Sequence, residues 1–365
     1  MVKVLVLTRY GRLGASSRLR SLQYLPWLFD AGLQVTEQHL LSDKFLAQRY
    51  QQGAYGALSL LRAYLNRLHS LMVSRRFDVV WIEKEALPWW PLWLELLLLR
   101  RVPYVLDYDD AIFHNYDLHP RSWVRGLLGK RIDGLMARAA LVIGGNSYLA
   151  QRARDAGATW VEVVPTVIDL ERYPSPIHTT QKNVEKMPNQ FGLPRIVWIG
   201  SPPTVHYLQS LRDPLQHLAA KQQFILRVIG GGVVDMPGVQ VEVMPWAEAS
   251  EVKDISDCQV GVMPLLDSAW ERGKCGYKLI QYMACGLPVV ASNVGVNSEI
   301  VRHGENGFLA TSTDEWVNSL YQLLQSPSLS QRMGAAGRNR VEDAFCLQKA
   351  APRIAKLLSQ VAERR

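Results

Sequence analysis

Short runs of Val, Ile and Leu alternate with helical patterns along the whole chain. In the first half, strands are expected at residues 2–8, 35–40, 77–84, 103–110, 140–146 and 160–165. Apolar positions recur with helical spacing between these runs, as in residues 17–30 and 147–156. Apolar strands separated by helices are typical of a parallel sheet with crossover helices. The pattern therefore predicts an α/β domain in the first half of the chain.

A polar segment without periodicity separates this series from a second one. Residues 173–194, YPSPIHTTQKNVEKMPNQFGLP, are rich in Pro and predict a linker. Five more apolar runs follow, at residues 195–200, 224–230, 239–245, 258–264 and 287–292. Ser312 and Glu315 are the ends of a capping box, S-T-D-E, which predicts the start of an amphipathic helix.

This order of elements predicts two doubly wound, Rossmann-like domains, whose facing loops at the carboxyl ends of the strands would form a ligand cleft. We expect an N-terminal domain at residues 1–172, a linker at 173–194 and a C-terminal domain at 195–345. Residues 346–365 have a helical pattern, and this last helix could cross back to the first domain.

Composition indicates a globular protein of the cytoplasm. The 365 residues suffice for two cores, and 48% of them are hydrophobic and 20% charged. The four Cys residues have no C-x-x-C spacing, which favours reduced thiols over a disulfide framework or a zinc site. The N-terminal sequence begins with a strand pattern and lacks the pattern of a signal peptide.

The basic charge points to an acidic partner. The formal net charge is +8, which suits nucleic acid, anionic lipid or a phosphorylated substrate. No helix-turn-helix or aromatic-basic RNA-binding pattern is visible, so nucleic acid is not expected. The stretch Ala86–Leu99, ALPWWPLWLELLLL, is shorter than the roughly 20 residues that span a bilayer.

This Trp-rich stretch has two interpretations. Trp89, Trp90 and Trp93 beside Arg100 and Arg101 could seat the first domain on an anionic membrane. The alternative is a packed crossover helix between the third and fourth strands. Further basic residues of the same domain are Arg75, Arg76, Arg121, Arg125, Lys130 and Arg131.

A Gly-rich, Lys-bearing loop precedes an apolar helix in Glu271–Ser292, ERGKCGYKLIQYMACGLPVVAS. Gly276 lets the backbone approach a ligand, and the free N–H groups of the following helix suit a diphosphate. Lys274 and Lys278 add positive charge, and Glu271 and Gln281 could accept hydrogen bonds from sugar hydroxyls. The alternative is a solvated loop with surface lysines.

Residues 263–310 around this loop resemble the donor-binding half of a family 4 glycosyltransferase of the GT-B fold. The resemblance rests on QYMACGLPVV (281–290), which is similar to the family's helix-turn-strand motif, and on the NGFL turn (306–309). In the first half, RYGRLGASSRLR (9–20), Asn146-Ser147 and PTVID (165–169) resemble the glycine-rich first loop and two later motifs. The resemblance covers nearly the whole chain.

The resemblance implies a cytoplasmic transferase that takes a UDP-, GDP- or dTDP-linked sugar and a glycan or lipid-linked acceptor, in the synthesis of a cell-surface polysaccharide or glycoconjugate. Retention of configuration also rests on the resemblance. Helix N–H groups and lysines would stabilise the departing diphosphate, so neither a metal ion nor a cofactor is expected.

Candidate residues for three tasks follow from these motifs. Catalysis is assigned to Asp110, His114, Lys278 and Glu271. Donor binding is assigned to Gly14, Gly200, Ser201, Lys274, Gly276, Lys278, Gln281, Trp246 and Glu299. Acceptor binding is assigned to Arg18, Arg20, Asp107 and Asp109.

The chemistry behind these assignments leaves alternatives open. In DYDDAIFH (107–114), Asp110 or His114 would be the general base of an inverting enzyme and would orient the acceptor in a retaining one. The Asp residues could equally cap a helix, whereas their spacing fits no standard oxygen cage for a metal. Arg18 and Arg20 suit a phosphate or surface ion pairs, and Trp246 suits a base or the core.

Two departures from the family pattern bear on the donor sugar. The family's pair of glutamates, with seven residues between them, would fall on Gly273 and Gln281, so Glu271 could take the sugar-hydroxyl role. The family's Arg and Lys after the first strand of the second domain are replaced by GSPPT (200–204). A GT-B nucleotide-sugar epimerase and a non-catalytic nucleotide-sugar-binding protein therefore remain alternatives, whereas the spacing of Gly11 and Gly14 disfavours a dehydrogenase.

Overall fold

The computed structural model describes residues 1–52, 56–174 and 192–364. They form two compact units. Unit 1 comprises Met1–Thr166, Gly273–Cys275 and Leu347–Arg365, and unit 2 comprises Val167–Arg272 and Gly276–Cys346. Most of the linker predicted at 173–194 lies outside the described residues.

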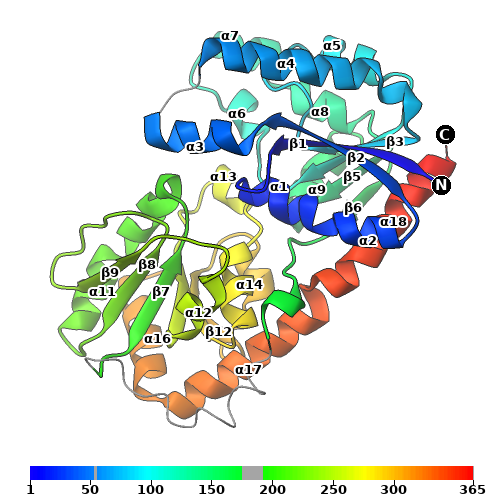
Figure 1. The fold of residues 1–365 in the computed structure, drawn as a ribbon. Coiled ribbons are helices and arrows are strands. Elements are labelled where there is room, and N and C mark those ends of the chain that lie inside the picture. Colours follow the sequence, from blue (N-terminus) through cyan, green and yellow to red (C-terminus); the bar gives the residue numbers. More distant parts are fainter. Residues whose placement is uncertain (53–55, 175–191, 365) are drawn as a thin grey trace. The chain divides into compact units, whose positions relative to one another are not determined.

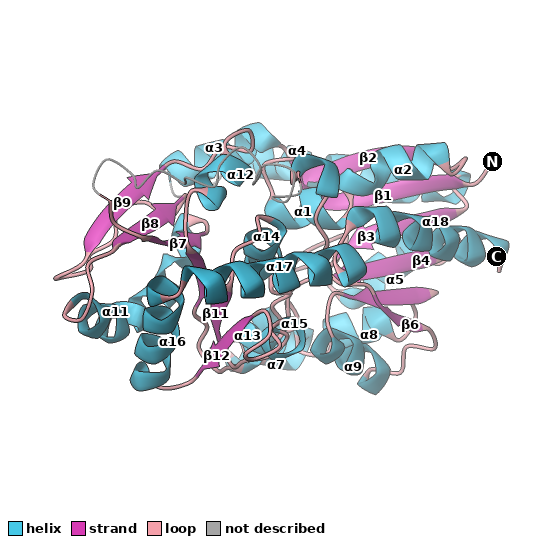
Figure 2. Cartoon of the chain, turned by 90° about the horizontal axis from the view of Figure 1, so that it is seen from below, coloured by secondary structure: helices cyan, strands magenta, loops and turns pink. Residues whose placement is uncertain are grey.

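Unit 1 is built on a parallel sheet of six strands (Figure 2). The strands are β1 (Lys3–Tyr10), β2 (Gln34–Leu41), β3 (Val79–Glu83), β4 (Tyr104–Tyr108), β5 (Leu141–Gly144) and β6 (Val161–Val163). Their order is β2-β1-β3-β4-β5-β6. The chain adds β2 on one side of β1 and the later strands on the other, so the switch point of the sheet lies between β1 and β3. Every residue of β3, β4 and β5 is buried, which explains why these strands are continuous apolar runs.

Helices cover both faces of this sheet (Figure 1). Those of unit 1 are α1 (Ala15–Arg20), α2 (Leu25–Asp30), α3 (Asp43–Gln52), α4 (Ala57–Met72), α5 (Leu92–Leu99), α6 (His114–Asp117), α7 (Ser122–Leu128), α8 (Arg131–Met136), α9 (Ser147–Asp155) and α18 (Leu347–Glu363). α4, α5 and α8 lie on one face, and α1, α2 and α18 on the other. No helix among the described residues is long and apolar enough to cross a bilayer.

The helical stretch expected at residues 17–30 is divided in the structure into two helices and a turn. α1 ends at Arg20, the chain makes a 3₁₀ turn at Leu22–Tyr24, and α2 begins at Leu25. Pro26 is the reason, because its missing N–H cannot complete a helical hydrogen bond and is tolerated only in the first turn of a helix.

Unit 2 has a second parallel sheet of six strands. They are β7 (Arg195–Ile199), β8 (Ile225–Ile229), β9 (Gln240–Met244), β10 (Val260–Met263), β11 (Val289–Ser292) and β12 (Gly307–Ala310). The order is β12-β11-β10-β7-β8-β9, which is the Rossmann order with its switch point between β7 and β10. β12 corrects the prediction of a turn at 306–309: four residues are too few to reveal a period, and pairing with β11 makes them a strand.

Two apolar cores flank the sheet of unit 2. One contains residues of α14 (Tyr277–Ala284), α15 (Asn297–Ile300) and α17 (Pro327–Ala344), and α12 (Glu251–Ser256) contributes Ile255. The other lies under α11 (Arg212–Ala219) and α16 (Thr313–Gln325). The predicted capping box of α16 is confirmed, because Ser312 Oγ accepts the Glu315 N–H while the Glu315 carboxylate accepts the Ser312 N–H.

Candidate functional site

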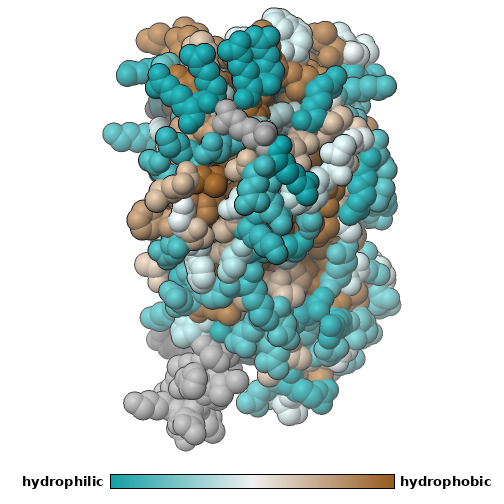
Figure 3. Space-filling model, turned by 90° about the vertical axis from the view of Figure 1, so that its right-hand side faces the viewer, coloured by the Kyte–Doolittle hydropathy of each residue, from teal (hydrophilic) through white to brown (hydrophobic). Residues whose placement is uncertain are grey.

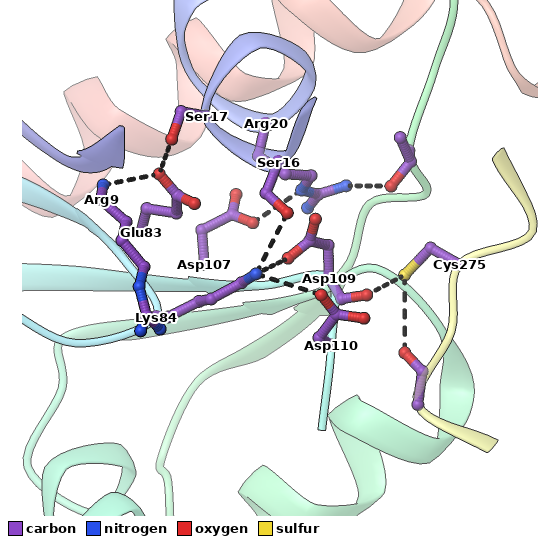
Figure 4. Close-up of polar contacts among 12 residues, drawn as sticks. Arg9, Ser16, Ser17, Arg20, Glu83, Lys84, Asp107, Asp109, Asp110 and Cys275 are labelled. Atoms are coloured by element: carbon purple, nitrogen blue, oxygen red, sulfur yellow. Dashed lines mark hydrogen bonds and ion pairs between the residues drawn. The ribbon is translucent and has the colours of Figure 1, made fainter. Parts of the chain in front are cut away.

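The carboxyl ends of the unit 1 strands bring charged side chains from distant segments to one edge of the sheet. Glu83 is the last residue of β3 and Lys84 follows it, whereas Asp107 lies near the end of β4 and Asp109 and Asp110 follow that strand. The set is completed by three residues of α1, Ser16, Ser17 and Arg20. Because parallel strands all end at the same edge, the loops at the switch point between β1 and β3 form the usual ligand-binding position of such sheets. Figure 4 shows these side chains pointing toward one another.

Lys84 is the centre of this cluster, and the sequence analysis missed it. Its Nζ lies 2.9 Å from Asp109 Oδ1, 3.2 Å from Asp110 Oδ2 and 3.1 Å from Ser16 Oγ (Figure 4). The residue is buried and has a left-handed backbone, with φ of 64°. Its sequence signal is a lysine at the end of an apolar strand, because lysine is rarely buried without a paired acid.

Asp110 lies between two ammonium groups. Its Oδ1 is 2.8 Å from Lys274 Nζ, and its Oδ2 faces Lys84. Burial alone would raise the pKa of Asp110, but the two lysines outweigh it and lower the pKa to about 2. Asp110 is therefore an anion at neutral pH that can accept hydrogen bonds, although a group with so low a pKa is a weak general base.

Asp107 and Arg20, both predicted to bind the acceptor, are buried and paired with each other. Arg20 Nε donates to Asp107 Oδ1 at 2.7 Å, and its Nη1 donates to the Val164 carbonyl at 2.9 Å. Burial raises the pKa of Asp107 to about 6, against the lowering effect of Arg20. This pair ties α1 to the ends of β4 and β6.

The first glycine-rich loop is held by hydrogen bonds to Glu83. Ser17 Oγ donates to Glu83 Oε2 at 2.6 Å, and the Arg9 N–H donates to the same oxygen at 2.9 Å. Gly14 precedes α1, where a Cβ would lie 2.5 Å from that of Tyr10. Glycine is therefore required at position 14 for the loop to pass this close to β1. In the same segment, Arg18 is buried and donates to the Arg12 carbonyl at 2.8 Å.

Several buried polar atoms of this edge have no hydrogen-bond partner among the residues that the structure describes. They include Arg20 Nη2, Glu83 Oε1 and Asp107 Oδ2. Buried polar atoms usually find a partner, so these atoms are candidates for contact with a polar ligand group.

His114 is engaged at both ring nitrogens. Nδ1 lies 2.8 Å from Asp117 Oδ1, and Nε2 lies 2.9 Å from the Tyr148 hydroxyl. The ring is part-buried at the start of α6. A proton transfer by His114 would have to break one of these two hydrogen bonds, so its catalytic role stays a prediction.

The short segment Gly273–Cys275 packs as part of unit 1, so Lys274 and Lys278 belong to different units. Asn146 Nδ2 donates to the Lys274 carbonyl at 2.9 Å, and the Cys275 thiol donates to the Asp109 carbonyl at 3.2 Å. Burial raises the pKa of Cys275, which keeps it a neutral thiol. Lys274 therefore sits beside Asp110 in unit 1.

In unit 2, the first turn of α14 and the loop after β7 lie at the switch-point ends of the sheet. Gly276 precedes α14 with φ of 66°, and its Cβ, if present, would lie 2.3 Å from Ile300 Cδ1. Lys278 is the second residue of the helix, with its Nζ 5.6 Å from the centre of the Trp198 ring. Gly200 and Ser201 follow β7, and Ser201 is exposed. The helix N–H groups and Lys278 make an electropositive end suited to a phosphate.

Glu271 is held in place by two hydroxyl groups. The Tyr207 hydroxyl donates to Oε1 at 2.7 Å, and Ser268 Oγ donates to Oε2. Glu271 is buried at the end of the short helix α13 (Ala269–Arg272), and Gln281 is buried in α14. Tyr207 was missed by the sequence analysis, because nothing local marks a tyrosine that binds a glutamate 64 residues away.

Trp246 and Glu299, the other donor-binding candidates, lie in different settings. Trp246 is half-buried against the core, and its Nε1 donates to Glu251 Oε2 at 2.6 Å. Glu299 is exposed in α15. No group of three or more His, Cys, Asp or Glu residues within the described ranges is arranged to hold a metal ion.

Known proteins are similar to parts of this chain. Residues 193–326 match the family model described as Glycosyl transferases group 1. These residues lie in unit 2, apart from Gly273–Cys275. Glu271, Lys278 and Gln281 are all among them.

Curated relatives match a shorter part of the chain. The N-acetyl-alpha-D-glucosaminyl L-malate synthase of Bacillus anthracis is 32% identical over 81 residues, which are 22% of this chain and 21% of that protein. The D-inositol 3-phosphate glycosyltransferase of Thermobifida fusca is 39% identical over 64 residues, 17% of this chain and 15% of that protein. The match thus spans about a fifth or less of the length of these relatives.

Solved structures resemble the whole chain. HepE of Anabaena in complex with UDP has a TM-score of 0.69 at 18% identity, covering 98% of this chain and 100% of that one. The sucrose-phosphate synthase of Thermosynechococcus elongatus has a TM-score of 0.72 at 15% identity and covers 100% of both chains. The predicted fold is confirmed: two Rossmann-like units of the GT-B type.

Proposed function

We propose that this chain is a glycosyltransferase that moves a sugar from a nucleotide-sugar donor to a glycan or lipid-linked acceptor. The proposed product is a cell-surface polysaccharide or similar glycoconjugate made on the cytoplasmic side of the membrane. The observation that carries the proposal is the match of residues 193–326 to the group 1 family model. The electropositive end of α14 and the Glu271 carboxylate both lie within these residues.

The proposed step exchanges one bond at the anomeric carbon for another. The C1–O bond to the diphosphate breaks, a C1–O bond to an acceptor hydroxyl forms, and the hydroxyl proton leaves with the departing phosphate. Negative charge grows on the diphosphate, so the N–H groups of α14 and Lys278 would stabilise the transition state without a metal ion. Retention of configuration is part of the proposal.

Glu271 suits the task of orienting the donor sugar. Its oxygens are positioned by Tyr207 and Ser268, and a carboxylate oxygen can accept more than one hydrogen bond. Gln281, which is buried in α14, is a second proposed partner of a sugar hydroxyl. UDP is the first candidate for the donor nucleotide, because HepE of Anabaena was solved with UDP and with UDP-glucose.

A thermal-shift screen against UDP, GDP, dTDP, CMP and NAD tests the donor. A ligand at a hundred times its Kd adds about 2.7 kcal/mol to the free energy of unfolding, which raises the melting temperature visibly. We expect selective stabilisation by one nucleoside diphosphate and its sugar conjugates. An unchanged melting temperature with every diphosphate, or an increase with NAD alone, contradicts the proposal.

The product separates the alternatives. Incubation with the stabilising nucleotide-sugar and candidate acceptors, followed by NMR of the anomeric proton, should show a new glycosidic bond with the donor's anomeric configuration. A change in the sugar of the donor without transfer would indicate an epimerase. Binding without any turnover would indicate a non-catalytic nucleotide-sugar-binding protein.

A further inference from the structure

The outer helices of unit 1 expose an unusual number of large apolar side chains. In α4 and α7 they recur at a spacing of three or four residues, which places them on one side of each of these two helices. They are Leu58, Leu61 and Leu65 of α4, Trp93 of α5, and Trp123 and Leu127 of α7, with exposed fractions between 55% and 80%. We call these six residues the apolar face. Soluble monomers rarely expose a large apolar patch without a partner for it.

Aromatic contacts join the three helices into one layer. Tyr64 of α4 stacks on Trp90, with ring centres 6.0 Å apart, and its hydroxyl donates to the Pro88 carbonyl at 2.9 Å. Trp89 meets the His119 ring at 5.9 Å, and Arg125 of α7 donates to the His119 carbonyl. The layer lies at the top of Figure 1, where α4, α5 and α7 are labelled. The apolar face therefore belongs to one continuous surface.

The charges of this layer are of one sign. Residues 56–76, 86–103 and 118–132, all described by the structure, contain a single acidic residue, Glu95. Glu95 is fully buried and accepts a hydrogen bond from Arg131. The exposed charges of the same segments are cations, among them Arg62, Arg75, Arg76, Arg100, Arg101 and Arg121. At the top of Figure 3, brown apolar and teal hydrophilic residues lie next to one another on the surface.

We propose that the outer face of α4, α5 and α7 docks unit 1 on the surface of an anionic lipid bilayer. The cations would lie among the phosphate headgroups, where each Lys or Arg contributes about 1 kcal/mol. The tryptophans suit the headgroup level, and the leucines would enter the acyl boundary. The proposal deepens the proposed function, because its link to a lipid-linked acceptor rests on the transferase activity, but the surface itself stands on the residues above.

Other occupants fit this surface less well. A second copy of the chain would bring two cationic layers together without an intervening carboxylate, which is repulsive. Nucleic acid would use the cations but offers nothing to the leucines of α4. A bilayer with anionic headgroups satisfies both the charge and the apolar side chains.

Vesicle sedimentation tests the proposal with the full-length protein. The protein should bind vesicles of phosphatidylglycerol with phosphatidylcholine, bind pure phosphatidylcholine weakly, and release as salt rises. Trp93→Ser with Trp123→Ser should weaken binding at least about tenfold, because two amphipathic anchors are lost. Arg100→Gln with Arg101→Gln should weaken it by roughly fivefold per cation.

Matched controls lie elsewhere on the molecule. Phe29→Ser removes an aromatic ring that is 76% exposed on α2, and Arg332→Gln removes an exposed cation of α17. Both should bind vesicles as the wild type does. Each variant is also tested for thermal stabilisation by the nucleoside diphosphate, which reports a folded unit 2 and is independent of lipid.

The outcomes separate the two proposals. Equal vesicle binding by the tryptophan variant and the wild type, or no preference for anionic vesicles, overturns the docking surface. A wild-type dimer that the tryptophan variant abolishes would assign the face to a second copy instead. Vesicle binding without a response to any nucleotide would leave the docking surface supported and reject the transferase proposal.

Discussion

Lys84 Nζ lies 3.2 Å from Asp110 Oδ2, although the two residues come from the ends of different strands. The same nitrogen lies 2.9 Å from Asp109 Oδ1, so one buried cation balances two carboxylates. Without Lys84, the two neighbouring carboxylates would repel each other without a shared cation between them. Lys84 is thus a positioning residue for the acidic cluster at the edge of the unit 1 sheet.

Lys84→Met should lower the free energy of unfolding by about 3 kcal/mol, because it removes a buried cation and leaves two part-buried carboxylates without it. The left-handed backbone costs the same in both proteins, since neither residue is glycine. Urea denaturation measures the loss. The exposed Lys44→Met should change stability by less than about 0.5 kcal/mol, and an equally small effect at Lys84 would contradict the ion-pair account.

The free energy of unfolding at low pH should depend on the ionisation of Asp110. Its pKa of about 2 lies below the ordinary value of 3.8, so the unfolded chain binds more protons between these two values. Stability therefore rises with pH in this window and is lost as pH falls from about 4 to about 2. The difference in the free energy of unfolding between the wild type and Asp110→Asn should shrink by about 2 kcal/mol as the pH falls through this window. Asp107 acts in the opposite direction between about pH 4 and 6 and is present in both proteins.

The measurement is urea unfolding of both proteins at a series of pH values. Lys274→Met should remove part of the same pH dependence, because its ammonium also lowers the pKa of Asp110. A wild-type and Asp110→Asn difference that stays constant with pH would show that Asp110 is not held ionised by the lysines.

Lys278→Ala should reduce turnover by roughly two orders of magnitude if its ammonium stabilises the departing diphosphate. Steady-state transfer kinetics with the stabilising nucleotide-sugar measure the effect. Lys253→Ala, an exposed lysine of α12, is the matched control and should have wild-type activity. Near-normal turnover of the Lys278 variant would reject its role.

Tyr207→Phe should lower kcat/KM by about tenfold, because it removes a hydrogen bond to a carboxylate, worth about 1.5–3 kcal/mol. Because Tyr207 and Glu271 are buried, the loss of this hydrogen bond should also lower the melting temperature, so the kinetics are measured well below it. Tyr321→Phe, at an exposed position of α16, serves as the control. A variant with wild-type kinetics would mean that Ser268 alone is sufficient to hold Glu271.

Two glycines with positive φ allow the cost of backbone strain to be compared with the cost of a steric clash at the Cβ position. Gly304 has φ of 81° and no atom within 4 Å of the place that a Cβ would take, so Gly304→Ala should cost about 1 kcal/mol. Gly276 has φ of 66°, and a Cβ there would lie 2.3 Å from Ile300 Cδ1. Gly276→Ala should therefore cost about 1–3 kcal/mol more. Equal losses in thermal unfolding would show that Ile300 moves aside freely.

Local patterns were sufficient for most of the fold. Neighbouring residues are enough to recognise the apolar strands of both sheets, the capping box at Ser312 and the glycine-rich loop before α14. They follow from side-chain burial, backbone geometry and helix-end hydrogen bonding, which act over a few positions. Pro26, whose break in the first helix was overlooked, is a local signal of the same kind.

The charged cluster could not be predicted in this way. Asp110 was singled out from its sequence, but its partners Lys84 and Lys274 lie 26 and 164 residues away. Likewise, Tyr207 reaches Glu271 only through the fold, and β12 becomes a strand only by pairing with β11.

The sequence by itself determined which segments become strands and helices, because those preferences act between near neighbours. Tertiary structure alone decided which charges meet and which apolar side chains stay exposed. An ionised side chain in the interior is stable only beside its counter-ion, and the parallel strand ends, not the chain order, bring Lys84, Asp110 and Lys274 within reach of one another.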